Sequence, residues 1–323
     1  TALAIASALR TNSLLPLTHL ALSGSPIGEE GMAALGNALL DKAPSCPVQI
    51  TEGDAHSGCR VAFMRCEAFT VTEDDTQLEY AGGLSPSAAL LLAAVLRSNT
   101  LVQAVQIEQS AAPLPVQRLK GMASSNDADR LTEFCASCLD VASGVLIGGL
   151  LNGNQVLQTM RVRSNARGVT GNQPLEAMLS TLRADEHRAI HTLDLGLYGV
   201  DDKGLQSIHQ SMTSGKLPML TALDLSGHCL ELQTREVTGT LLSISRSLSV
   251  LKLGAHECQD PLRVLQSLQS FHNIESGLPS SEQTGSAKSN AAADTKTSYH
   301  RVEGTFIELH DCDWAIREEV VSI

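Results

Sequence analysis

The chain has 323 residues, of which 43% are apolar but only 3% are aromatic, and its net charge at pH 7 is −12. This negative charge repels nucleic acids and anionic lipid surfaces, so it argues against a nucleic-acid-binding or membrane-surface function for the chain as a whole. No apolar run reaches the ~18 residues that a membrane-spanning helix requires.

The first predicted elements are a helix and a strand–helix pair. Residues 1–10 are small and apolar, like the end of a repeat helix, so we expect further repeats or another domain upstream of them. Leu17, Leu20 and Leu22 follow the spacing LxxLxL, which is typical of a short strand that buries its leucines. A turn rich in Gly, Pro and Ser comes next, and residues 32–39 have apolar positions at helical spacing.

The same spacing, with other apolar residues at some positions, recurs along the chain. The further predicted strands are 66–71, 102–107, 157–162, 190–195, 220–225 and 248–253. For the first of these, residues 48–50 are an alternative strand. Helices are predicted before the strands at 102 and 157, from Ser85 to Leu96 and, as a long apolar run, from Leu131 to Leu151.

The spacing between strands indicates a repeat. The last three strands begin 30 and 28 residues apart, and a near-constant period means that each unit buries its apolar face against its neighbours. Longer intervals earlier in the chain predict insertions near residues 46–80 and 108–130. Residues 276–299 are polar and of low complexity, so a flexible linker or loop is predicted there. Residues 300–323 are predicted to form a C-terminal cap or a segment that docks on a partner.

Residues 17–39 resemble one unit of the leucine-rich-repeat family, in its ribonuclease-inhibitor-like subclass. Ile27, Gly28 and Gly31 match the turn consensus N-x-I-G-x-x-G of that subclass, although Ser25 or Gly24 replaces the asparagine. The resemblance implies an α/β solenoid over residues 1–275, with a curved parallel sheet on its concave side, helices on its convex side and about seven irregular units. The asparagine ladder of the family is predicted to be poorly kept.

Motifs for catalysis, phosphate binding or metal binding are missing from the sequence, so no catalytic residue, metal ligand or cofactor is predicted. Cys135 and Cys138 form a CxxC pair, but we place them in the apolar helix, as buried structural cysteines. Residues 310–313, His-Asp-Cys-Asp, are interpreted as a loop at a strand end. The eight cysteines follow no disulfide framework, which favours an intracellular location: the cytoplasm, or the inside of a cytoskeletal or organellar assembly.

The candidate partner-binding residues are the polar positions between the inward leucines, because these point out from the concave side of such a sheet. They are His19, Gln103, Gln106, Arg161, Arg163, Asp194, Asp224 and Lys252. A plain solvated surface is the alternative interpretation of this polar stripe.

The sequence therefore predicts a non-catalytic scaffold for protein–protein interaction. We expect it to be a structural subunit of a large intracellular assembly, such as an axonemal or ribosomal particle, with protein partners, no membrane contact and no small-molecule substrate. One alternative is a regulatory leucine-rich-repeat protein that resembles the Ran GTPase-activating protein at the level of the fold. A second is an RNA-contacting ribonucleoprotein subunit, suggested by the cluster Arg118, Lys120, Arg161, Arg163 and Arg167.

Overall fold

The fold is taken from a computed structural model of the chain. It describes residues 2–11, 17–24, 26–42, 61–107, 112–122, 132–137, 139–163, 172–184, 189–196, 198–226, 240–241, 243–244, 247–254, 297–302 and 305–310. The helices are α1 (Ala2–Thr11), α2 (Gly28–Lys42), α3 (Pro86–Ser98), α4 (Val116–Leu119), α5 (Val141–Leu151), α6 (Gln173–Thr181) and α7 (Asp202–Thr213). The strands are β1 (His19–Ala21), β2 (Phe63–Arg65), β3 (Thr70–Val71), β4 (Gln77–Tyr80), β5 (Ala104–Ile107), β6 (Leu114–Pro115), β7 (Glu133–Ser137), β8 (Thr159–Arg163), β9 (Thr192–Asp194), β10 (Ala222–Ser226), β11 (Val250–Gly254), β12 (Thr297–Val302) and β13 (Thr305–His310).

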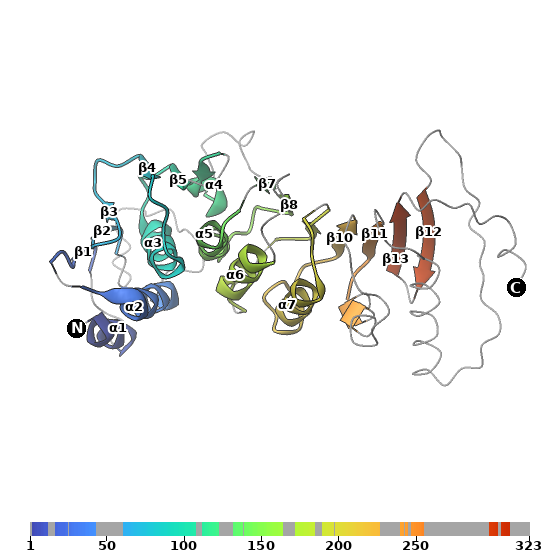
Figure 1. Cartoon of the computed structure of the whole chain (residues 1–323), viewed down its shortest axis with the longest axis horizontal. Helices are drawn as coiled ribbons and strands as arrows, with labels where there is room; N and C mark the ends of the chain where they lie inside the picture. The colour runs from blue at the N-terminus through green and yellow to red at the C-terminus, as the bar shows by residue number, and fades with distance from the viewer. Residues whose placement is uncertain are drawn as a thin grey trace, which may run out of the picture.

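Up to β11 these elements follow one another along the long axis of the molecule in chain order, and β13 then lies between β11 and β12 (Figure 1). The helices other than α4 lie along one side and the strands along the other. From β7 onward, strand and helix alternate regularly as β7–α5–β8–α6–β9–α7–β10. This alternation is a mixed α/β architecture consistent with a leucine-rich-repeat type of fold.

The strands form three hydrogen-bonded sheets. The largest has seven strands in the order β12-β13-β11-β10-β9-β8-β7, and all but the edge strand β12 run parallel. Two three-stranded sheets, β1-β2-β3 and β4-β5-β6, lie toward the N-terminus. The seven-stranded sheet does not curl, so the predicted arc is not confirmed and its outward side is called the outer strand face below.

One residue of each unit forms a buried ladder across the seven-stranded sheet. Met160, Leu193, Leu223 and Leu251 lie in register on β8, β9, β10 and β11, and each is at most 2% exposed. They are the central apolar positions of the predicted LxxLxL segments. Burial against the helix layer therefore explains why the spacing repeats: each strand turns alternate residues toward the helices.

Helix α5 is buried on every side and lies between α3 and α6. Its start is capped by Asp140, whose Oδ1 accepts the Ser143 N–H at 2.7 Å. Gly144 and Gly148 let α6 approach closely, since a Cβ built on them would lie 2.2 and 2.3 Å from carbonyl oxygens of that helix. These glycines therefore serve helix packing.

Two of the sequence predictions place a strand or a helix wrongly. The predicted helix 131–151 begins only at Val141, and Glu133–Ser137 forms strand β7 instead. Phe134 and Ala136 are buried while the residues beside them are exposed, so this part of the apolar run has the two-residue period of a strand. Cys135 is accordingly an exposed strand residue rather than a buried helical one, and Cys138 lies outside the described residues.

The strand predicted at 66–71 is also wrong. The parallel neighbour of β1 is β2, while β3 returns antiparallel to it. Cys66, Phe69 and Val71 are buried as expected, but Val61, Met64 and Cys66 are buried too and keep the LxxLxL spacing around the parallel strand β2, five residues earlier than predicted. The alternative strand at 48–50 lies outside the described residues.

Two buried asparagines connect successive units just before their strands. The Oδ1 of Asn154 accepts the N–H groups of Val156 and Leu157 at 2.8 and 2.9 Å, and its Nδ2 donates to the Leu119 carbonyl at 2.8 Å. Asn99 makes the equivalent bonds before β5: Oδ1 accepts two backbone N–H groups at 2.8 Å, and Nδ2 donates to the Ala62 carbonyl at 2.9 Å. Neither asparagine was predicted from the sequence.

Lys120 is a buried lysine that donates a hydrogen bond to the backbone of Asn99. Its side chain is only 4% exposed, and its Nζ donates to the Asn99 carbonyl oxygen. Burial, helped by the positive charge of Arg97, lowers the pKa of Lys120 to about 7. Its charge therefore belongs to the interior of the fold, and it is not available to the RNA-contacting surface suggested from the sequence.

The C-terminal predictions fall partly on described residues. Strand β13 pairs parallel with β11, and β12 pairs antiparallel with β13 at the sheet edge. Residues 276–296 of the predicted linker and residues 311–323 lie outside the described residues, so the linker, the cap and the loop at 311–313 stay predictions. The two predicted insertions also stay predictions, since residues 46–60, 108–111 and 123–130 lie outside the described residues.

Candidate functional site

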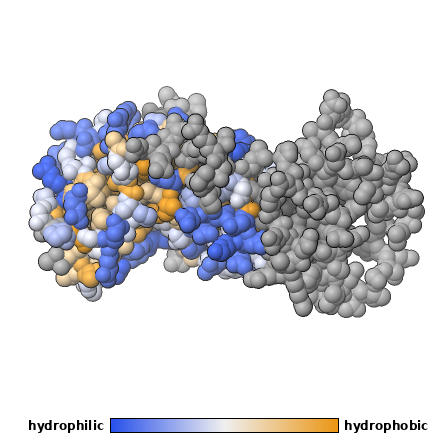
Figure 2. Space-filling model, in the orientation of Figure 1, coloured by the Kyte–Doolittle hydropathy of each residue, from blue (hydrophilic) through white to orange (hydrophobic). Residues whose placement is uncertain are grey.

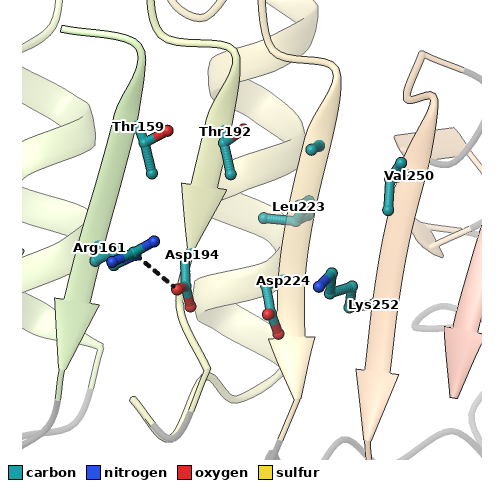
Figure 3. Close-up of a pocket in the computed structure, with 9 residues that line it drawn as sticks. Thr159, Arg161, Thr192, Asp194, Leu223, Asp224, Val250 and Lys252 are labelled. Carbon is teal, nitrogen blue, oxygen red and sulfur yellow. Dashed lines mark ion pairs between the residues drawn. The ribbon is translucent and has the colours of Figure 1, made fainter. Parts of the chain in front are cut away.

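The structure brings five of the eight predicted binding residues together on the outer strand face. The backbone register aligns Arg161, Asp194, Asp224 and Lys252 across four neighbouring strands, from β8 to β11 (Figure 3). Arg163 lies two residues further along β8. Neighbouring parallel strands lie ~4.8 Å apart, so this row places charges of both signs close together.

Arg163 and Asp194 form the strongest contact of this row. The guanidinium donates to both carboxylate oxygens, with Nη1–Oδ1 at 2.7 Å and Nη2–Oδ2 at 2.6 Å. Such two-point pairs are stronger and more directional than single ones. The Gly196 N–H adds a third bond to Oδ1 at 3.0 Å. Both side chains are therefore fixed before any partner arrives.

These contacts also set the protonation of the pair. Burial by itself would raise the pKa of Asp194, but the bonds from Arg163 and the Gly196 N–H, with the charges of Arg163 and Arg161, lower it below its usual range. The hydrogen bond to Asp194 raises the pKa of Arg163. The pair stays ionised across the physiological pH range.

Arg161 is more exposed and bridges two carboxylates. Its Nη1 lies 3.3 Å from an oxygen of Glu133 on β7, and its Nε lies 3.4 Å from Oδ2 of Asp194. Its side chain keeps 45% of its surface exposed. Arg161 therefore offers a partner more contact area than Arg163, whose fork is already occupied.

A small open hollow of about 150 Å³ lies over this row (Figure 3). The hollow is lined by Thr159, Arg161, Thr192, Asp194, Ala222, Leu223, Asp224, Val250 and Lys252. Thr192, Ala222 and Val250 form a second row in register, two residues before the charged one. Within the hollow, Asp224 is positioned by Ser226, whose N–H and Oγ donate to its Oδ1 at 2.9 and 2.6 Å.

The other three predicted residues lie apart, on the two smaller sheets. His19 stacks on Phe63 with ring centroids 4.7 Å apart, and its Nε2 lies 2.9 Å from a carboxylate oxygen of Glu73. Gln103 immediately precedes β5 and Gln106 lies within it. A single site that contains all eight residues is therefore not formed.

Glu133 and Cys135 belong to this outer face but were missed, because β7 was interpreted as helix. They lie in register with Thr159 and Arg161. The sequence pattern that indicates strand β7 is the LxxLxL spacing of the apolar residues at positions 131, 134 and 136.

The hydropathy of the surface in Figure 2 changes along the molecule. Apolar residues gather over the N-terminal half of this view, and hydrophilic residues predominate toward α7.

Among the described residues, no helix is long and apolar enough to cross a membrane. Within the same part of the chain, no group of three or more His, Cys, Asp or Glu side chains is placed to hold a metal ion.

The comparisons with known proteins concern the fold. Residues 14–36 match a family model described as Leucine Rich repeat. This match supports a leucine-rich-repeat family. It covers most of the first predicted unit, and it does not confirm the ribonuclease-inhibitor-like subclass.

The chain matches no curated protein. A solved structure titled "Leiomodin-1 Actin-Binding Site 2 (ABS2)" is similar to it over 50% of this chain and 88% of its own length, with 20% sequence identity and a TM-score of 0.34. A similarity of this degree carries no argument about function.

Proposed function

We propose that this chain is a non-catalytic protein-interaction module that binds a partner protein through the outer strand face of β7 to β11. We further propose that it is a structural subunit of a large intracellular assembly of the axonemal or ribosomal kind. The family match supports a repeat protein, and stacked repeats typically bind partners through an extended surface.

The observation that carries the proposal is the fixed row of charges on this face. Arg163 and Asp194 hold each other by two bonds, Arg161 bridges Asp194 and Glu133, and Ser226 orients Asp224. A surface whose side chains are already ordered loses less conformational entropy when it binds. The opposite side of the same strands packs on the helices, so only the outer face of these strands can receive a partner.

These ion pairs do not favour the RNA-contacting alternative. Phosphate binding gains its free energy from cations that neutralise phosphates, but Arg161 and Arg163 are already paired with carboxylates. Among the described residues, the regulatory GTPase-activating alternative has no specific observation in its favour.

The proposal is tested by affinity capture from cell extract with the tagged chain as bait, followed by mass spectrometry. The test variant, Arg161→Gln with Asp224→Asn, removes one charge of each sign from the outer face. The matched control, Lys203→Gln with Glu30→Gln, removes the same charges from exposed positions on α7 and α2.

We expect the test variant to lose most of the specific partner while the control retains it, with unchanged circular dichroism for both. Equal capture by wild type, test variant and control would contradict a binding role for this face.

A further inference from the structure

Among the described residues that line the hollow, one carboxylate oxygen has no partner. Asp194 receives Arg163, Arg161 and the Gly196 N–H. Asp224 lies next to it in register, but Ser226 contacts only its Oδ1, and Oδ2 has no hydrogen bond or ion pair to a described residue. The hollow therefore presents one acceptor for a positive charge.

The surroundings of this oxygen favour a long cationic side chain. Ala222 and Val250 lie in register with each other two residues before Asp224 and Lys252, and both line the hollow. Arginine and lysine bury their aliphatic stems on such apolar surface while the charged head reaches a polar group.

The hydroxyls of the hollow distinguish arginine from lysine. Thr159 and Thr192 also line it, and each hydroxyl can accept a hydrogen bond. A guanidinium has five N–H donors in a planar fork and so uses several separated acceptors, whereas an ammonium acts as a compact point charge. Two cations already line the hollow: Arg161 lies between Glu133 and Asp194, and Lys252 lies in register beside Asp224.

We infer that the hollow takes an arginine side chain of the partner protein, with the guanidinium on Asp224 and the stem across Ala222 and Val250. This inference rests on the proposed function and names the side chain of the partner that its binding surface recognises. The net charge of −12 draws positively charged partners toward the chain at long range, which is consistent with it.

The test is an NMR titration of the isotope-labelled full chain with the capped peptide Gly-Gly-Arg-Gly-Gly. The same peptide with citrulline in place of arginine is the matched ligand, because it keeps the shape of the side chain without its charge. We expect shift changes at amides of β9, β10 and β11 with the arginine peptide and none with the citrulline peptide at equal concentration. Asp224→Asn should weaken binding about fivefold to tenfold, while the control Glu30→Gln leaves it unchanged.

The outcomes separate this inference from the proposed function. Equal shifts with both peptides, or undiminished binding by Asp224→Asn, would overturn arginine recognition. If the peptide fails to bind but the capture experiment still depends on the outer face, the arginine inference is wrong and the protein-binding face stands. If neither peptide binding nor partner capture changes when this face is altered, both the arginine inference and the proposed binding face are wrong.

Discussion

Replacing the buried Lys120 by methionine should stabilise the fold, and the gain should depend on pH in a defined way. The pKa of this lysine is 10.5 for the unperturbed side chain and about 7 in the folded protein, chiefly because of burial. One pKa unit corresponds to about 1.4 kcal/mol, so the buried charge opposes folding by roughly 4 kcal/mol at pH 7. The bond from Nζ to the Asn99 carbonyl offsets about 1 kcal/mol of this.

The sign of the pH effect follows from the protons bound in each state. Between pH 7 and 10.5 the unfolded chain holds a proton on Lys120 that the folded chain has released, so the stability of the wild type rises with pH there. Lys120→Met has no such group. The difference in unfolding free energy between variant and wild type should therefore shrink by about 1.4 kcal/mol per pH unit from pH 8 to 10.

Urea denaturation followed by circular dichroism at pH 7, 8, 9 and 10 measures this difference. Lys216→Met is the matched control, since the Lys216 ammonium also donates to carbonyl oxygens, those of Leu179 and Ser180, but Lys216 is only partly buried. Its effect should stay constant over the same range. A constant difference for Lys120→Met, or a loss of stability at pH 7, would refute the assignment of a buried lysine with a pKa near 7.

Three further predictions concern the packing of the fold. Leu223→Ala should lower the free energy of unfolding by about 2–5 kcal/mol through lost burial and a residual cavity. Leu3→Ala, at a residue that is 51% exposed, should change it little. Equal effects of the two variants in urea titrations would refute the buried ladder. Gly148→Ala should lower the free energy of unfolding by about 1–3 kcal/mol, because its Cβ would lie 2.3 Å from the Met178 carbonyl oxygen. The control is Gly82→Ala, whose Cβ would have no atom within 4 Å. A neutral effect of Gly148→Ala would show that α5 and α6 lie further apart. Asn154→Ala should lower the free energy of unfolding by about 3 kcal/mol, because it leaves buried N–H and carbonyl groups unpaired. Asn37→Ala, at an exposed position of α2, should lower it far less. Equal losses of stability in the two variants would contradict the structural role of Asn154.

The strand positions were the most predictable part of the fold. The LxxLxL spacing placed β8 to β11 correctly because their central residues, such as Leu193 and Leu251, must reach a thin apolar core between strands and helices. The spacing failed at β7, where Phe134 and Ala136 adjoin the apolar helix α5, so one long run concealed two elements. Periodicity cannot separate a buried strand from a buried helix when both are apolar.

The candidate site was predictable in outline but not in its contacts. Alternation along each strand identified Arg161, Asp194, Asp224 and Lys252 as outward residues, and the parallel register then aligned them. Which charge pairs with which depends on rotamers and on the start of each strand, neither of which the spacing contains. A signal for the buried asparagines was nevertheless present, since Asn154 stands three residues before the first apolar position of its LxxLxL segment.

The most direct measurement of the central claim is site-specific photo-crosslinking of the full chain in native cell extract. A photoreactive amino acid is placed at Thr159 on the outer strand face or, as the control, at the exposed Lys203 on α7. We predict that the Thr159 position crosslinks to one specific protein partner and that the Lys203 position does not. Crosslinks to that partner from Lys203 but none from Thr159 would contradict a binding surface on the strands.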